Sequence, residues 1–169
     1  MDFRKRSTLK SLVAFSVMAA LPGSRGAVQA DTTEAVLLTV HDGLKKQVFK
    51  LTDLDALPQQ QFTTSTIWTT EPTAFSGPAL ADVMASSGLS AEALTLRAVN
   101  NYSITLNSST LEENAPIVAT RINGKTFSVR ERGPLWVVFP YDADSRYRSE
   151  HTFAASIWQL TDILADTTP

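Results

Sequence analysis

The sequence predicts an α+β fold, with a mixed, mostly antiparallel β-sheet and two or three short helices. About eight short segments rich in Val, Ile, Thr and aromatic residues favour strands. The helical segments do not alternate with them as they would in a parallel α/β protein. No internal repeat or low-complexity tract interrupts the 169-residue chain. We therefore expect one domain of this class.

Strands are predicted where β-branched and aromatic residues form apolar runs or alternate with polar residues. These segments are residues 35–40, 47–51, 61–68, 94–99, 102–106, 117–122, 126–129 and 135–139. The last of them is apolar throughout, so burial on both faces is expected. Residues 157–164 fit either a closing strand or a short helix.

Turn residues separate these strands. His41-Asp42-Gly43 is expected to join the first two strands into a hairpin, and Asn100-Asn101 predicts a second turn. Asn123-Gly124 predicts the clearest hairpin, because both residues adopt the positive φ angles of a type I′ turn. Loops are predicted where Glu71-Pro72 and Ser76-Gly77-Pro78 occur, and over the polar stretch 141–153.

The strongest helix pattern covers residues 78–86, where Leu80, Val83 and Met84 share a face and Gly88 is a favourable stop. A second short helix is expected to begin with Thr52 as its N-cap and to end at Pro58. Residues 109–114 predict a single helical turn.

Composition excludes several kinds of site. The chain has no cysteine, which excludes disulfides, Fe–S clusters, thiolate metal sites and a cysteine nucleophile. Its two histidines, His41 and His151, are far apart in the sequence, and zinc needs three or four protein ligands. No nucleophile elbow or glycine-rich phosphate loop is present, so no catalytic residue and no metal ligand is predicted.

Residues 1–30 have the pattern of a signal peptide. Basic residues at positions 4, 5, 6 and 10 precede an apolar run at 12–21, and Val28-Gln29-Ala30 offers a cleavage site. An uncleaved anchor or a buried N-terminal helix is the alternative. We expect residues 31–169 to form a single periplasmic or secreted domain, exported by the general secretory or the twin-arginine route.

Cleavage after Ala30 would leave ten basic and sixteen acidic residues, a net charge of −6. An acidic surface is unfavourable for nucleic acid, so no nucleic-acid partner is expected. No membrane span is expected after cleavage, because the apolar run is too short to cross a bilayer.

Three stretches together resemble a known family. They are LRAVNNYSITL around Asn100-Asn101-Tyr102, ATRINGKTFSVRERGPLWVVFPYD at 119–142 and SIWQL at 156–160, and the helix start at 75–83 fits the same pattern. Residues 61–165 resemble the oxidoreductase molybdopterin-binding domain of sulfite-oxidase-type enzymes. More closely, they resemble short exported bacterial proteins that carry a minimal version of it.

The resemblance implies molybdenum on a pterin dithiolene, with a protein cysteine as a further ligand and basic residues at the pterin phosphate. This chain has no cysteine. Trp136 stands where larger members have an arginine, and Trp158 stands where they have a lysine. An indole cannot replace a cation that faces phosphate. We therefore expect no cofactor, with molybdopterin as the alternative.

The candidate ligand-binding residues are polar, cationic or aromatic side chains near predicted turns. They are Asn100, Asn101, Tyr102, Arg121, Arg130, Arg132, Trp136 and Trp158. The arginines are interpreted as a basic lip for an anion or, alternatively, as a solvated hairpin face. Trp136 and Trp158, with Trp68, Phe139 and Tyr141, are expected to line a pocket or to be core.

The sequence thus predicts an exported, soluble pseudoenzyme with a minimal molybdopterin-domain-like fold that acts as a ligand-binding or accessory module. Its expected partner is a small anionic ligand or a periplasmic protein. The alternative function is a sulfite-oxidase-type oxidoreductase in which a residue other than cysteine completes the metal shell.

Overall fold

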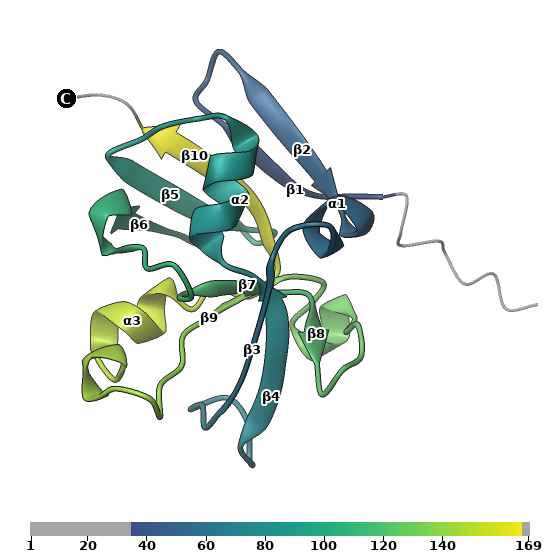
Figure 1. The fold of residues 1–169 in the computed structure, drawn as a ribbon, viewed down its shortest axis with the longest axis vertical. Helices are drawn as coiled ribbons and strands as arrows, with labels where there is room; N and C mark the ends of the chain where they lie inside the picture. Colours follow the sequence, from purple (N-terminus) through teal and green to yellow (C-terminus); the bar gives the residue numbers. More distant parts are fainter. Residues whose placement is uncertain (1–34, 167–169) are drawn as a thin grey trace, which may run out of the picture. The chain divides into compact units, whose positions relative to one another are not determined.

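The computed structural model describes residues 35–166, so the predicted signal peptide lies outside the described residues. The described part contains ten strands and three α-helices (Figure 1). The strands are β1 (Val36–His41), β2 (Lys46–Lys50), β3 (Gln59–Thr64), β4 (Thr73–Pro78), β5 (Ala93–Ala98), β6 (Ser103–Asn107), β7 (Ile117–Ala119), β8 (Arg121–Ile122), β9 (Trp136–Val138) and β10 (Leu160–Asp166). The helices are α1 (Leu51–Asp55), α2 (Leu80–Ser87) and α3 (Glu150–Ala155).

The strands form three sheets. A five-stranded sheet has the order β2-β1-β10-β5-β6, a three-stranded sheet has the order β3-β4-β8, and β7 pairs with β9. The β1–β10 pair is parallel and the other pairs are antiparallel. The predicted α+β class, with a mixed and mostly antiparallel sheet, is confirmed. Among residues 35–166, no helix is long and apolar enough to cross a membrane.

The first predicted hairpin is confirmed. Asp42 Oδ1 accepts hydrogen bonds from the N–H groups of Leu44 and Lys45, at 2.8 and 2.6 Å, and so stabilises the turn between β1 and β2. The helix that follows is capped two positions earlier than expected. Lys50 is its N-cap, with its N–H donating to Asp53 Oδ2 at 2.8 Å, so the predicted cap Thr52 lies inside α1.

The predicted loop at Ser76-Gly77-Pro78 is wrong, because these residues form the end of β4. Gly77 lies against β7 so closely that a Cβ would collide with the Val118 carbonyl oxygen. Glycine in a strand permits this close approach of two backbones. In the sequence, however, the same glycine beside proline has the pattern of a loop.

Two further predictions, the second strand of the Asn123-Gly124 hairpin and the loop at 141–153, are wrong. Only Arg121–Ile122 and the Asn123-Gly124 turn form a hairpin, and the predicted strand 126–129 does not form. β7 pairs with β9 instead. Within the predicted loop 141–153, α3 begins at Glu150 and is capped by Ser149, whose Oγ accepts from the Thr152 N–H at 3.1 Å.

The remaining elements follow the predictions more closely. The strand expected at 61–68 is shifted to Gln59–Thr64, and the helical turn expected at 109–114 is a 3₁₀ turn at Ser108–Thr110. Residues 157–164 were predicted as either a strand or a helix, and in the structure Leu160 begins strand β10. The helix α2 ends at Gly88, which adopts a φ of 69°.

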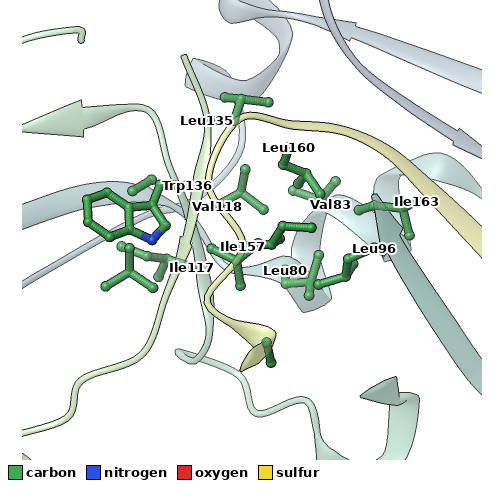
Figure 2. Packing of buried hydrophobic residues seen from close by; sticks show 14 of the residues in the cluster. Leu80, Val83, Leu96, Ile117, Val118, Leu135, Trp136, Ile157, Leu160 and Ile163 are labelled. Atoms are coloured by element: carbon green, nitrogen blue, oxygen red, sulfur yellow. The ribbon is translucent and has the colours of Figure 1, made fainter. Parts of the chain in front are cut away.

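The core lies between α2 and the strands. Leu80 and Val83 of α2 lie near Leu96 of β5 and Ile163 of β10, as Figure 2 shows. Ile117, Val118, Leu135 and Trp136 continue the same cluster and are also buried. The strand β9 is buried at all three positions, which confirms that the apolar run 135–139 is internal.

Replacing Gly77 with alanine should destabilise the protein by at least about 2 kcal/mol, because the new methyl group forces β4 away from β7. Urea denaturation of the purified variant measures this loss. Gly88→Ala is the matched control. It meets no atom within 4 Å and should cost only about 1 kcal/mol through its positive φ. Equal losses in the two variants would contradict the close approach.

Candidate functional site

Trp68 is the centre of a cluster of aromatic rings. It lies in the segment that joins β3 to β4, and its ring centroid is 5.8 Å from those of both Trp136 and Trp158. The rings of Phe153 and Tyr141 lie at 6.0 and 6.4 Å. All four contacts are edge-to-face, the arrangement that the ring quadrupoles favour. The cluster therefore joins segments that are far apart in the sequence.

Trp136 and Trp158 are held against each other by the backbone. The two residues form an isolated antiparallel bridge between β9 and the segment before β10. Trp136 is only 1% exposed, and its Nε1–H donates to the Ser156 carbonyl at 3.2 Å. A buried indole N–H needs such an acceptor, so this bond orients the ring within the core.

Arg132 covers two of the indole rings. Its guanidinium carbon lies 5.7 Å from the Trp136 ring centroid and 5.2 Å from that of Trp158. Arg132 ends a 3₁₀ turn at Val129–Glu131 with a φ of 74°, and its carbonyl accepts from the Gln159 N–H at 3.1 Å. This backbone contact ties the arginine to the segment that carries Trp158.

A pocket of about 260 Å³ opens beside the cluster. It is lined by Trp68, Ala98, Asn100, Tyr102, Phe153, Ala154, Ser156, Ile157 and Trp158. No lining side chain carries a charge, and most of the lining is aromatic or aliphatic. Such an apolar lining with a few polar groups is typical of a small-molecule site.

Two hydrogen bonds hold the polar rim of this pocket. The Tyr102 hydroxyl donates to the Ala154 carbonyl at 3.1 Å, which connects the start of β6 to α3. The Tyr102 N–H donates to Asn100 Oδ1 at 3.1 Å. The Asn100 amide group is thus oriented by the turn itself.

The structure brings together five of the eight predicted site residues. Asn100, Tyr102 and Trp158 line the pocket, and Trp136 and Arg132 contact Trp158. Asn101 does not line it. It is exposed and has a φ of 66°, so it serves the turn.

The three arginines of the predicted basic lip, Arg121, Arg130 and Arg132, lie in different environments. Arg121 forms a two-pronged ion pair with Asp55, with N···O distances of 2.5 and 2.7 Å, and Asp55 raises the arginine pKa. It lines a different depression, together with Gln59–Gln61 and Ser76. Arg130 is exposed in the 3₁₀ turn at Val129–Glu131. Only Arg132 lies against the aromatic cluster.

The sequence reasoning missed the wall of the pocket that α3 supplies. Phe153, Ala154 and Ser156 fall within or directly after the stretch interpreted as a loop. The signal that would have found it is Ser149, a favourable N-cap followed by Glu150 in the first turn. Phe139 and Tyr141, the other aromatic candidates, are buried.

A short hydrogen-bonded chain lies behind the pocket. The Tyr141 hydroxyl is bonded to Ser156 Oγ, which donates to the Thr152 carbonyl at 2.7 Å. Tyr141 is 2% exposed, and burial raises the pKa of its hydroxyl to about 12. The neutral phenol is therefore the form that the fold stabilises.

No metal site is evident among residues 35–166, where no three His, Asp or Glu side chains gather in a way that could hold an ion. His151 lines a cavity with Glu112, Arg146 and Tyr147, whereas His41 lies beside Arg97 and Asp162. The two histidines therefore line different surface depressions.

Comparison with known proteins supports the fold. The crystal structure of the sulfane dehydrogenase SoxCD from Paracoccus pantotrophus is similar, with a TM-score of 0.62 and 14% sequence identity. The similarity covers 85% of this chain and 41% of that chain, so this protein spans less than half of its neighbour's length. The likeness supports a distant sulfite-oxidase-like fold and concerns the fold alone. No protein-family model and no curated protein matches the sequence.

The stability of the protein should fall between about pH 10 and pH 12 through Tyr141. An unfolded tyrosine ionises near pH 10, whereas the folded one holds its proton to about pH 12. Its contribution is therefore complete below about pH 10 and is lost as the pH rises through the folded value, about 2–3 kcal/mol in total.

The measurement compares free energies of unfolding from pH 9 to 12 for the native protein and Tyr141→Phe. The difference between the two should shrink across this interval by the amount above. Tyr102→Phe is the control, since the Tyr102 side chain is 46% exposed, whereas that of Tyr141 is buried. A constant difference for Tyr141→Phe would contradict a phenol held neutral by burial.

Proposed function

We propose that this protein is an exported ligand-binding module on a sulfite-oxidase-like fold, and that it works without molybdenum. The observation that carries the proposal is the pocket between Trp158, Phe153 and Tyr102, which is open to solvent and has aromatic walls. Rigid aromatic walls bind flat, apolar groups with little loss of side-chain entropy.

The lining of the pocket argues for an uncharged ligand. Its polar groups are Asn100, Tyr102 and Ser156, all neutral. Burying an anion there without a cation would cost several kcal/mol. An uncharged ligand therefore replaces, in this proposal, the anionic ligand expected from the sequence, because Arg121 is paired with Asp55 and does not line the pocket.

The residues present do not fit molybdopterin. The chain has no cysteine to supply a thiolate to the metal. Trp136 and Trp158 occupy positions where a cation is expected for phosphate, and the Arg132 guanidinium is stacked on both indoles. The side chains around the pocket are neutral and mostly apolar, so they offer neither a thiolate for the metal nor a free cation for the phosphate.

Filling the pocket should weaken the binding of a ligand that occupies it. Indole is a suitable probe, because it is flat, neutral and small, and indole-3-carboxylate is its anionic counterpart. Titration calorimetry should show heat of binding for indole and weaker binding for the carboxylate. Ala154→Phe, which projects a ring from the pocket wall, should weaken indole binding at least about tenfold.

Arg121→Ala is the matched control and should leave indole binding unchanged, since Arg121 lies in another depression. Circular dichroism checks that both variants fold. Loss of binding in Arg121→Ala but not in Ala154→Phe would transfer the site to the basic residues. Equal binding of indole by all variants would refute the pocket.

The proposal also predicts the metal content. Elemental analysis of protein recovered folded from the exported compartment should find molybdenum well below one atom per chain, and oxidation should release no fluorescent pterin. Near one molybdenum per chain would instead support the oxidoreductase, with a residue other than cysteine in the metal shell.

A further inference from the structure

The strand β3 forms an open edge of the three-stranded sheet β3-β4-β8. It pairs with β4 without a bulge, from Gln59 opposite Pro78 to Thr64 opposite Thr73. Within residues 35–166, no strand pairs with its other side. A regular strand of six residues is long enough to template another strand.

The hydrogen bonds of β4 show which groups of β3 point outward. The carbonyls of Ala74 and Ser76 accept from Asn123 and Thr120 on the far side of β4, at 2.8 and 2.9 Å. In an antiparallel ladder, the N–H and C=O of one residue point to the same side, and the side alternates along the strand. The intervening residue Phe75 therefore faces β3.

By the same alternation, Gln60 and Phe62 face β4, and Gln59, Gln61 and Thr63 direct their N–H and C=O groups outward. The next residue of the outward set is Ser65, whose N–H is bonded to Asp142 Oδ2 at 2.6 Å. That carboxylate ends the open edge, so three consecutive outward residues remain for a partner strand.

The other edge strands of the two larger sheets are protected or too short to pair, unlike β3. The strand β2 carries Lys46 and Lys50, and lysine is a common guard against edge-to-edge pairing. The strand β8 has only two residues. At the start of β6, Tyr102 is bonded to α3, which lies against this strand. By contrast, residues 56–70 contain no charged side chain.

We propose that the β3 edge binds the β3 edge of a second copy of this chain, antiparallel and around a two-fold axis at Gln61. Gln61 then lies opposite the partner's Gln61, and Gln59 lies opposite the partner's Thr63. The chain as a whole is acidic, and this neutral stretch is where two identical strands meet without charge repulsion.

The arrangement forms a closed dimer. A two-fold axis uses the same edge on both copies, so no open β3 edge remains for a third chain. The outward N–H and C=O groups of each copy are satisfied by the other, and the glutamine side chains lie opposite uncharged amide or hydroxyl groups.

Sedimentation equilibrium tests this dimer on the purified protein. The average mass should rise from one chain toward two as the concentration increases from about 1 μM to 1 mM. Gln61→Lys places two lysines opposite each other at the axis and should raise the dissociation constant about fivefold. An equimolar mixture with Gln61→Glu should restore association, since opposite charges then face across the axis.

Ser86→Lys is the matched control, because Ser86 is exposed on α2 and the variant adds the same charge. Its dissociation constant should equal that of the native protein. Amide hydrogen exchange gives a second readout: the Gln61 amide should become protected as the concentration rises, and the Phe62 amide should not change. A single-chain mass at 1 mM, or a dimer that Gln61→Lys does not weaken, would overturn the proposal.

Discussion

The burial of the Trp136 side chain is the constraint on which the rest of the site depends. Its indole N–H must be satisfied inside the core, and the Ser156 carbonyl does this. Fixing Ser156 also fixes its hydroxyl, which joins Tyr141 to the carbonyl of Thr152 in α3. Ser156 is the C-cap of α3, so the buried donor ties the end of this helix to β9, and α3 supplies one wall of the pocket.

Several arginines of the described region act as parts of the fold. Arg121 pairs with Asp55, Arg146 with Glu112 and Arg148 with Asp142. Arg132 is stacked on two indoles, where a neutral side chain could not make the same contact with the ring faces. The apolar lining of the pocket and the paired arginines lead to the same conclusion. The site offers aromatic surface to a ligand and leaves few cations for a charged one.

Local patterns in the sequence were enough to predict much of this fold. The apolar, β-branched run of β1, the alternation in β2 and the helical spacing of α2 are local properties, and each predicts its element. The strand β4 was missed because Gly77 reflects contact with β7, which is distant in sequence. The site shows the same contrast between local patterns and contacts that are distant in sequence. Asn100, Tyr102 and Trp158 were singled out by their residue types and line one pocket. The role of Arg121 instead depends on Asp55, 66 residues away.

The parallel pairing of β1 with β10 has a consequence for synthesis. These strands are hydrogen-bonded neighbours within the five-stranded sheet, yet they come from opposite ends of the described chain. The sheet cannot be completed until residue 166 has left the ribosome, because β10 separates β1 from β5. Every nascent chain therefore passes through a stage in which β1 and β5 lack their shared neighbour. During that stage the unpaired strands can bind chaperones, and the unfolded chain can still cross a membrane.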